Sequence, residues 1–220
     1  MHTFATPAPV TAVVTVPAGR IYVTAAARDD TTVEVRPADP AKGRDVKLAA
    51  QVTAAYDDGV LRVTAPDRSR VLGSTGAVEV TVQLPAGSRV EATTASAEFT
   101  TEGPLGGVAF DSAQGTVSVE QAATARLTVV DGDITVGRLG GDAQIRTSRG
   151  DIKVAEAAAG TVVLRAEAGS VAVAAAAGVS AVLDAGTTVG RIRNTLANAG
   201  TPALAIQATT TVGDITASSL

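Results

Sequence analysis

The sequence contains no cysteine and a single histidine, His2, among its 220 residues. Without cysteine the chain can form neither disulfides nor thiolate metal sites, and it has no cysteine nucleophile. One histidine beside the terminus cannot supply a Ser–His–Asp catalytic group or a histidine-based zinc site. We therefore expect a protein that is not an enzyme, with no catalytic residues, no metal site and no bound cofactor.

Aromatic residues are also scarce, at 2% of the chain, so stacking platforms for bases or sugars are poorly supplied. The net charge of −4 and the scattered basic residues argue against a nucleic-acid partner. No run of about 18 apolar residues is present, so we predict no membrane span. The first residues, MHTFATPAPV, lack the pattern of a secretory signal, and we expect a cytoplasmic protein if Met1 is the true start.

What the sequence does contain is an internal repeat of glycine, a variable residue and then Val or Ile. Its copies are GTVSV, GDITV, GDIKV, GSVAV, GRIRN and GDITA, which start at Gly115, Gly132, Gly150, Gly169, Gly190 and Gly213. An earlier relative, AEFTT, starts at Ala97. In most copies a second small apolar residue follows two positions later. This alternation predicts a β-strand with one buried face, which we name the A strand.

A second series of apolar residues lies between these copies and predicts a B strand in each unit. Its centres are Phe110, Leu127, Ile145, Leu164, Leu183 and Ile206. The distance from each centre to the next repeat glycine is five residues in the first four copies and seven in the last two. The B-to-A corner is therefore predicted to be tight, and most of the length variation falls in the A-to-B connection.

Two alternating strands per unit of about 17–23 residues suit a solenoid, because a single unit cannot bury its apolar face alone. Parallel crossovers are overwhelmingly right-handed. We therefore predict an all-β, right-handed, single-stranded parallel β-helix that occupies residues 1–220 as one domain. Residues 96–220 are expected to form the regular coils, and residues 1–95 a less regular strand-rich part that caps the first coil.

The first part of the chain carries its own strand and turn signals. Alternation predicts strands that include DVKLAAQVTA (45–54), and Asp58-Gly59 predicts a hairpin turn. Some antiparallel pairing is expected here. Segments 36–45 and 65–76, rich in Pro, Gly and charge, are predicted to be surface loops.

The segment TSRGDIKVAE (147–156) contains Arg149-Gly150-Asp151, the tripeptide that integrin-type receptors bind. Gly150 occupies the same slot as Gly132 and Gly213, and each is followed by Asp and Ile. We therefore assign Gly-Asp to the coil corner, regard Arg149 as incidental, and favour a structural role over receptor recognition.

The residues after two of these glycines, Asp133 and Asp151, are expected to stack ~5 Å apart in adjacent coils. Stacked carboxylates could bind Ca²⁺, or could resemble the acidic clefts of β-helical enzymes that cleave polysaccharides. The alternative is that each Asp accepts backbone N–H bonds at the corner. We favour this alternative, because no acidic row continues into the neighbouring coils.

The segments FATPAPVTAVVTVPAGRIYV, DDGVLRV and VTVQLPAGSRVEA, together with GDITV, GDIKV and VGDITA, resemble the bacterial putative-adhesin family of domains of unknown function, also called Toastrack domains. The resemblance covers essentially the whole chain. It implies a β-strand-repeat domain, with related members forming single-stranded right-handed β-helices. Members are often coupled to membrane segments or found near signalling and envelope-stress proteins, and the family has no defined catalytic residues.

From these observations we expect a non-enzymatic binding or scaffold protein whose partner is an unidentified protein or glycan. Its binding surface is predicted at the A-to-B edge, in segments 137–142, 155–160 and 194–202, where the length varies. One alternative is a carbohydrate-active enzyme built on a β-helix. Another is self-association through the C-terminal coil, which the sequence leaves without an obvious cap.

Overall fold

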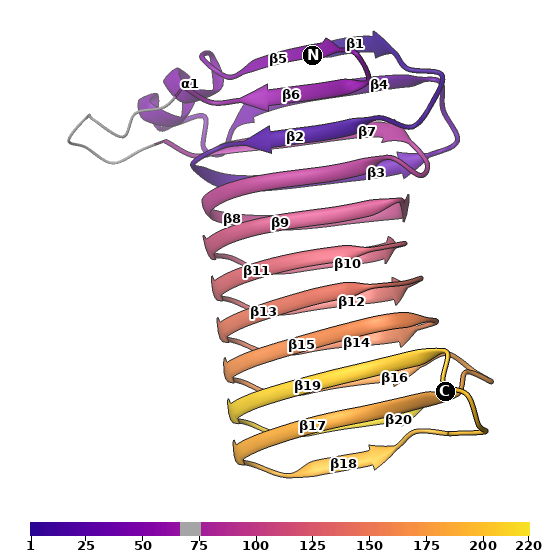
Figure 1. Cartoon of the computed structure of the whole chain (residues 1–220). Coiled ribbons are helices and arrows are strands. Elements are labelled where there is room, and N and C mark those ends of the chain that lie inside the picture. The colour runs from indigo at the N-terminus through magenta and orange to yellow at the C-terminus, as the bar shows by residue number, and fades with distance from the viewer. Residues whose placement is uncertain (67–75) are drawn as a thin grey trace.

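The strands of the repeat stack in two parallel ladders that face each other across a common interior (Figure 1). The computed structural model describes residues 1–66 and 76–220. The strands that face the viewer in Figure 1 form the front ladder, which contains β9 (Gly107–Gln114), β11 (Ala125–Asp131), β13 (Ala143–Arg149), β15 (Gly160–Ala168), β17 (Ala181–Val189) and β19 (Leu204–Val212). The back ladder contains β10 (Val117–Ala122), β12 (Ile134–Leu139), β14 (Ile152–Ala157), β16 (Val171–Ala175), β18 (Ile192–Thr195) and β20 (Ile215–Ser219). These are the predicted B and A strands, and they wind as a right-handed parallel β-helix.

The two ladders are joined by the long strand β8 (Arg89–Leu105), which pairs with β9 in its first part and with β10 in its second. Above β8 in Figure 1 lie the strands of the N-terminal part, which extend both ladders. They are β1 (His2–Ala5), β2 (Thr11–Thr15), β3 (Ala18–Ala26), β4 (Asp30–Pro37), β5 (Thr53–Asp57), β6 (Val60–Thr64) and β7 (Val78–Pro85). The predicted boundary at residues 95 and 96 thus falls inside one strand.

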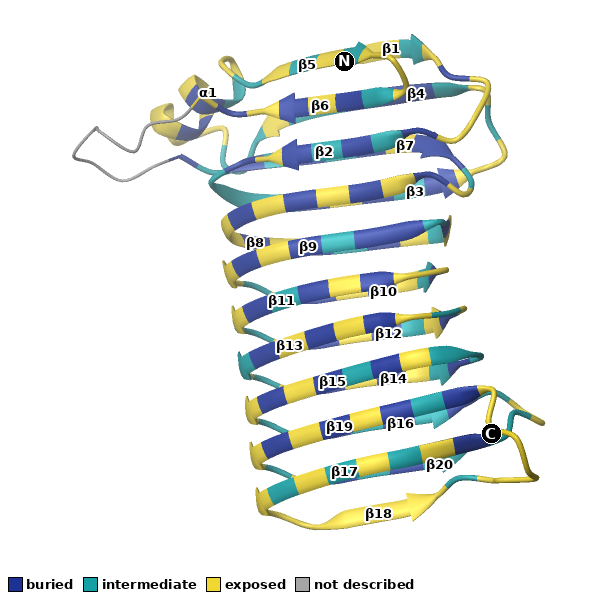
Figure 2. Cartoon of the chain, viewed as in Figure 1, coloured by how far each residue is buried: buried dark blue, intermediate teal, exposed yellow. Residues whose placement is uncertain are grey.

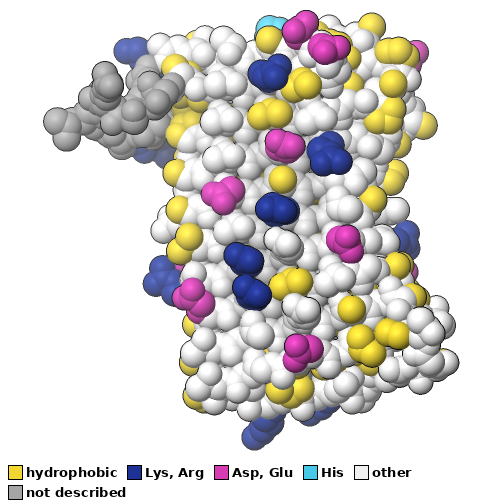
Figure 3. Space-filling view, viewed as in Figure 1, with side chains coloured by type: hydrophobic (Ala, Val, Ile, Leu, Met, Phe, Trp, Pro, Cys, Tyr) yellow, Lys and Arg dark blue, Asp and Glu magenta, His cyan; other side chains and the backbone are white. Residues whose placement is uncertain are grey.

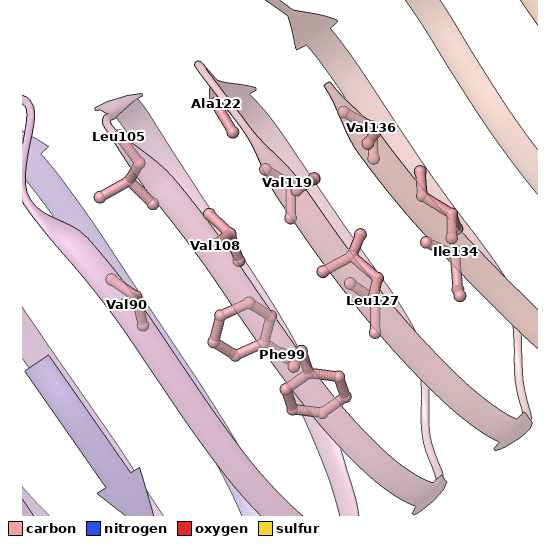
Figure 4. Packing of buried hydrophobic residues seen from close by; sticks show 14 of the residues in the cluster. Val90, Phe99, Leu105, Val108, Val119, Ala122, Leu127, Ile134 and Val136 are labelled. Carbon is pink, nitrogen blue, oxygen red and sulfur yellow. The ribbon is translucent and has the colours of Figure 1, made fainter. Parts of the chain in front are cut away.

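The core is filled by the inward residues of every strand, so buried and exposed positions alternate along the ribbons (Figure 2). Each inward residue lies over its register partner in the next coil, as Val117, Ile134 and Ile152 do. Two bulky core side chains, Phe99 and Phe110, face each other across the interior, and their rings stack with centroids 4.6 Å apart. Figure 4 shows Phe99 among the aliphatic side chains of the neighbouring strands. This continuous stack of apolar rows holds the coils together, because no coil buries its own face.

The repeat glycine is required by the backbone at the B-to-A corner. At Gly150 the φ angle is +135°, a region that residues with a Cβ rarely adopt. A Cβ there would also collide with the carbonyl oxygen of Gly132 in the preceding coil. The corner is therefore shaped by close stacking of one backbone turn on the next.

The last two coils are stacked in the opposite order from their order in the sequence. Strand β19 pairs with β15 on one side and β17 on the other, and β20 likewise lies between β16 and β18. The coil of β17 and β18 is therefore outermost (Figure 1). The expectation of an uncapped C-terminal coil is wrong, since that coil is covered on both sides.

The stacking also corrects the register inferred for the last two B strands. Leu164 pairs with Ala208, which pairs in turn with Ala185, so the equivalents of Leu164 in the last two B strands are Ala208 and Ala185 rather than Ile206 and Leu183. The distance from Ala208 to Gly213 and from Ala185 to Gly190 is five residues, as in the earlier copies. The B-to-A corner therefore keeps one length throughout, and the apparent seven-residue spacing is a misassigned centre.

The N-terminal part confirms two expectations. Strands β1, β4 and β7 pair antiparallel, as do β5 and β6. The turn between β5 and β6 contains Asp58 and Gly59, both with positive φ, which matches the predicted hairpin.

One strand prediction and part of one loop prediction are wrong, because a short helix, α1 (Gly43–Ala49), occupies positions 43–49. Its apolar residues Val46 and Leu48 are two apart, which is the spacing of one strand face; on the helix they point in different directions, and Val46 is 44% exposed. Leu48 is buried against the core, and the carboxylate of Asp45 accepts a 3.0 Å hydrogen bond from the Ala77 amide. These tertiary contacts favour the helix over the strand. The predicted loop 65–76 lies mostly outside the described residues.

Candidate functional site

The acidic residues at the corners are engaged by the backbone of the next coil. The carboxylate of Asp133 accepts a 2.8 Å hydrogen bond from the Asp151 amide, and that of Asp151 accepts a 2.7 Å bond from the Ser170 amide. Asp214 accepts in the same way from the Arg191 amide, at 2.8 Å. The corner-capping interpretation of Asp133 and Asp151 is therefore confirmed. Among the described residues, no group of three or more His, Cys, Asp or Glu side chains could hold a metal ion.

The prediction that Arg149 is incidental is wrong. Arg149 lies directly opposite Asp131 in the adjacent strand, and the guanidinium Nη2 is 2.8 Å from Asp131 Oδ2. Arg149 therefore neutralises an acid of the preceding coil. The Arg-Gly-Asp tripeptide follows the end of a strand at a stacked corner, and each of its three residues has a structural partner or constraint there.

The repeat also builds an open surface, which is the outer face of the front ladder. Figure 3 shows this face, where Lys and Arg side chains form a column and acidic side chains lie beside it. The register places outward side chains in rows along the solenoid axis. One such row contains Thr64, Thr15, Thr93, Asp111, Thr128, Arg146, Arg165 and Thr209.

A shallow groove of about 620 Å³ lies on this face and crosses β8, β9, β11, β13 and β15. The groove is hollow because β9 lines it only with Gly107, Val108 and Ala109, while the adjacent strand β11 presents Arg126. On β8, Arg89 lies opposite Gly107 of β9. The groove is therefore bounded by the long polar side chains of Arg89 and Arg126. Such a lining offers a ligand hydrogen bonds and charges of both signs, because Glu91 and Asp142 line the groove together with Arg89 and Arg126.

Three arginines on consecutive strands of this face are exposed: Arg126, Arg146 and Arg165. Arg146 lies directly opposite Arg165 in the parallel register. Among the described residues, none of the three forms an ion pair with a carboxylate.

Of the three predicted binding segments, 137–142 reaches the groove. Its last residue, Asp142, lines the groove and accepts a 2.8 Å hydrogen bond from the Thr161 amide. Segment 155–160 leads into β15 at the same corner, and 194–202 lies beside the outermost coil. The groove thus combines two A-to-B connections, those that contain Thr124 and Asp142, with the outer faces of the strands, which the prediction from length variation did not include.

Two titratable groups, Asp30 and Asp39, have a clearly shifted pKa, and both lie in the N-terminal part, away from the groove. The hydrogen bond donated by Arg28 lowers the pKa of Asp30, and the one donated by the Ala41 amide lowers the pKa of Asp39. His2 is exposed in β1, where its ring stacks on Phe4 with centroids 6.4 Å apart. These groups stabilise local turns and strand ends rather than the front face.

The geometry defines a right-handed parallel β-solenoid with a polar outer face, and comparison with protein families agrees. Residues 13–219 match the family model described as Toastrack DUF4097, and the chain belongs to that family. No curated protein matches the sequence. No helix in the described ranges is both long and apolar enough to cross a membrane.

Solved structures that are similar to this chain include bacterial proteins described as putative adhesins. One from Bacteroides fragilis NCTC 9343 has a TM-score of 0.61 and 15% identity, and the alignment covers 98% of this chain and 95% of that one. One from Parabacteroides distasonis ATCC 8503 has a TM-score of 0.49 and 13% identity, with coverage of 98% and 95%. The first likeness establishes the shared fold.

Proposed function

We propose that the chain is a non-enzymatic, adhesin-like binding module that presents the outer face of its front ladder to a ligand. The observation that carries this proposal is the open groove, whose outward side chains are fixed in register by the stacked strands. Repeat proteins commonly bind through such extended surfaces, because each coil adds another row of contacts. The family and the described adhesins of the same fold support this class of function.

The enzymatic alternative finds less support in the side chains. A polysaccharide-cleaving site needs carboxylates that are free to face one substrate. The stacked carboxylates of Asp133 and Asp151 instead accept hydrogen bonds from backbone amides. Substrate turnover by purified protein that persists after repeated chromatography would contradict the non-enzymatic proposal.

The proposal is tested by filling the groove without changing the charge. Ala109 points outward on β9, so Ala109→Gln places a longer side chain in the hollow. Ala172→Gln makes the same change at a partly exposed outward position of β16 in the back ladder and serves as the matched control. Wild type and both variants are screened on a glycan array and used to capture partners from native lysate.

We expect at least one ligand that binds wild type and Ala172→Gln but binds Ala109→Gln several-fold more weakly, because steric filling removes contact area. If every ligand binds all three proteins equally, the front face is not the binding surface. If a ligand is lost from the Ala172 variant alone, the back ladder carries the function instead.

A further inference from the structure

Three arginines elsewhere in this solenoid lie opposite acids in the adjacent strand. Arg149 pairs with Asp131 at 2.8 Å, Arg138 with Glu156 at 3.5 Å, and Arg20 with Glu79 at 3.1 Å. In each case the two residues are direct register partners. At these three places a stacked charge faces one of opposite sign, which avoids repulsion between neighbouring strands.

The front face departs from this rule at Arg146 and Arg165. These register partners carry the same charge, and Arg126 stands on the strand before them. Among the described residues, no carboxylate oxygen lies within 4.0 Å of a nitrogen in any of the three side chains. Like charges directly opposite one another destabilise a sheet, so the folded protein gains if an anion sits between them.

We infer that this arginine stripe, Arg126, Arg146 and Arg165, binds an acidic polysaccharide of the polyuronate class, which lies along the solenoid axis on the front face. The inference rests on the proposed binding function and names its ligand. Strands in a ladder are about 4.8 Å apart, so the stripe spans roughly 10 Å, a length that suits an extended chain with recurring carboxylates. A guanidinium binds a carboxylate with two parallel hydrogen bonds, a geometry that lysine cannot offer.

The neutral residues around the stripe suit sugar hydroxyls. Gln144 lies opposite Arg126, and Gln207 and Thr209 continue the outward rows onto β19. These exposed side chains both donate and accept hydrogen bonds, as hydroxyl groups do. A polyuronate presents carboxylates and hydroxyls together, so it matches the alternation of arginines with amide and hydroxyl side chains.

A nucleic acid fits this face less well. The outward rows of the described front ladder contain no aromatic residue on which bases could stack. Acidic residues, among them Asp111, Asp142 and Asp184, lie on the same face as the stripe. The same carboxylates accept hydrogen bonds from sugar hydroxyls, so they are compatible with a polysaccharide.

The test uses polygalacturonate oligomers as the probe, with dextran as the uncharged control, and measures affinity by calorimetry at low and moderate salt. Arg146→Gln/Arg165→Gln removes two charges from the stripe. Arg138→Gln/Lys153→Gln removes two exposed charges from adjacent strands of the back ladder and is the matched control. We expect the front variant to bind about tenfold more weakly than wild type and the control variant to bind within twofold of it.

Thermal unfolding supplies the second readout. The front variant should melt at or above the wild-type temperature, since the repulsion between its register partners is removed. Polygalacturonate should raise the melting temperature of wild type and of the back variant but not of the front variant.

Three outcomes overturn the inference. The first is no binding of polygalacturonate at low salt, and the second is equal loss of affinity in both variants. The third is stronger binding of single-stranded DNA or polyphosphate than of the polyuronate, which would point to a nonspecific cation surface. None of these outcomes affects the groove-filling test with Ala109→Gln, so failure of the ligand assignment is separate from failure of the proposed function.

Discussion

The middle coils of the solenoid and the two coils at its C-terminal end share one residue pattern but differ in what determines their neighbours. In the middle, β11, β13 and β15 stack in chain order. At the end, the coil of β19 and β20 is inserted before the coil of β17 and β18. Every strand remains parallel and in register, so the pattern alone does not fix the order.

Side-chain polarity offers a physical reason for this exchange. The inner coil directs Leu204, Ile206 and Ile215 into the core, where they are buried. The outer coil directs Asn194 inward at the position of Ala217, and its Ile192 remains 47% exposed. The free-energy cost of a polar inward residue is smallest in a coil that is open to water on one side, because the polar group is not fully buried there. The more apolar coil therefore takes the covered position.

The first prediction concerns the corner glycine and carries the largest effect. Gly150→Ala in a middle coil should destabilise the protein by ~3 kcal/mol or more, because a Cβ there is strained and collides with the Gly132 carbonyl. Gly190→Ala makes the same change in the outermost coil, which can move away from Gly213. Urea denaturation should show a clearly smaller loss for the Gly190 variant. Equal losses would mean that the outer coil is held as rigidly as the middle ones.

The second prediction compares two isoleucines in one inward row. Ile152 pairs through Val171 and Ile215 with Ile192, so the row runs from the middle to the end. Ile152 is 1% exposed, and Ile152→Ala should cost about 2–5 kcal/mol through lost burial and a cavity. Ile192→Ala should cost about 1 kcal/mol or less, because nearly half of that side chain already faces water. Chemical denaturation of both variants measures the difference, and a large loss for Ile192→Ala would indicate that another molecule covers the end.

The third prediction restores sequential stacking by deleting residues 177–202. The deletion joins Ala176 to Ala203, so two residues then connect Ala175 to Leu204. The same number connects Ala157 to Gly160, the register partners of Ala175 and Leu204. We expect the shortened chain to keep its β-rich circular dichroism spectrum and to melt only a few degrees lower, because one terminal coil is lost.

The deletion also exposes β19 and β20, whose inward residues are more apolar than those of the natural end. Size-exclusion chromatography with light scattering should therefore detect stronger self-association than in wild type. A shortened chain that fails to fold would show that the outer coil is needed for the stack. Self-association of the intact protein remains a prediction, and the coil to test is that of β17 and β18.

Several features of this architecture could be predicted from the sequence, since the spacing of Gly132, Gly150 and Gly169 defines the corner and hence the coil. The exchange of coils could not, because GDITA at Gly213 fits beside GSVAV at Gly169 as well as GRIRN does. An inward pattern identifies the buried face but not the neighbour that covers it. Helix α1 was missed because Val46 and Leu48 are two residues apart, which is the spacing of a strand, and the sequence does not reveal the tertiary contacts that bury Leu48 alone.

The candidate site was missed although a signal was available. Arg146 and Arg165 each follow a B-strand centre by one residue, which places both on the outward face in adjacent coils. Treating the basic residues as scattered along the chain overlooked this alignment in the repeat register. In a solenoid, charge is better assessed along the rows than along the sequence.

The last prediction compares two polar residues in one inward row, and its effect is the smallest. Thr101 pairs with Val119, and the row continues through Val136 and Val154 to Asn194. Thr101 is 1% exposed, and among the described residues its hydroxyl oxygen has no hydrogen-bond partner. Thr101→Val keeps the shape and removes that buried group, so it should stabilise the protein by about 1 kcal/mol. Asn194→Val should give no such gain and should change stability by less than about 0.5 kcal/mol, because Asn194 is exposed and the substitution also removes the 3.0 Å hydrogen bond that its Oδ1 accepts from the Leu196 amide. Thermal unfolding of both variants measures the difference. An equal gain in stability for Asn194→Val would mean that water is excluded from the end of the solenoid as fully as from its middle.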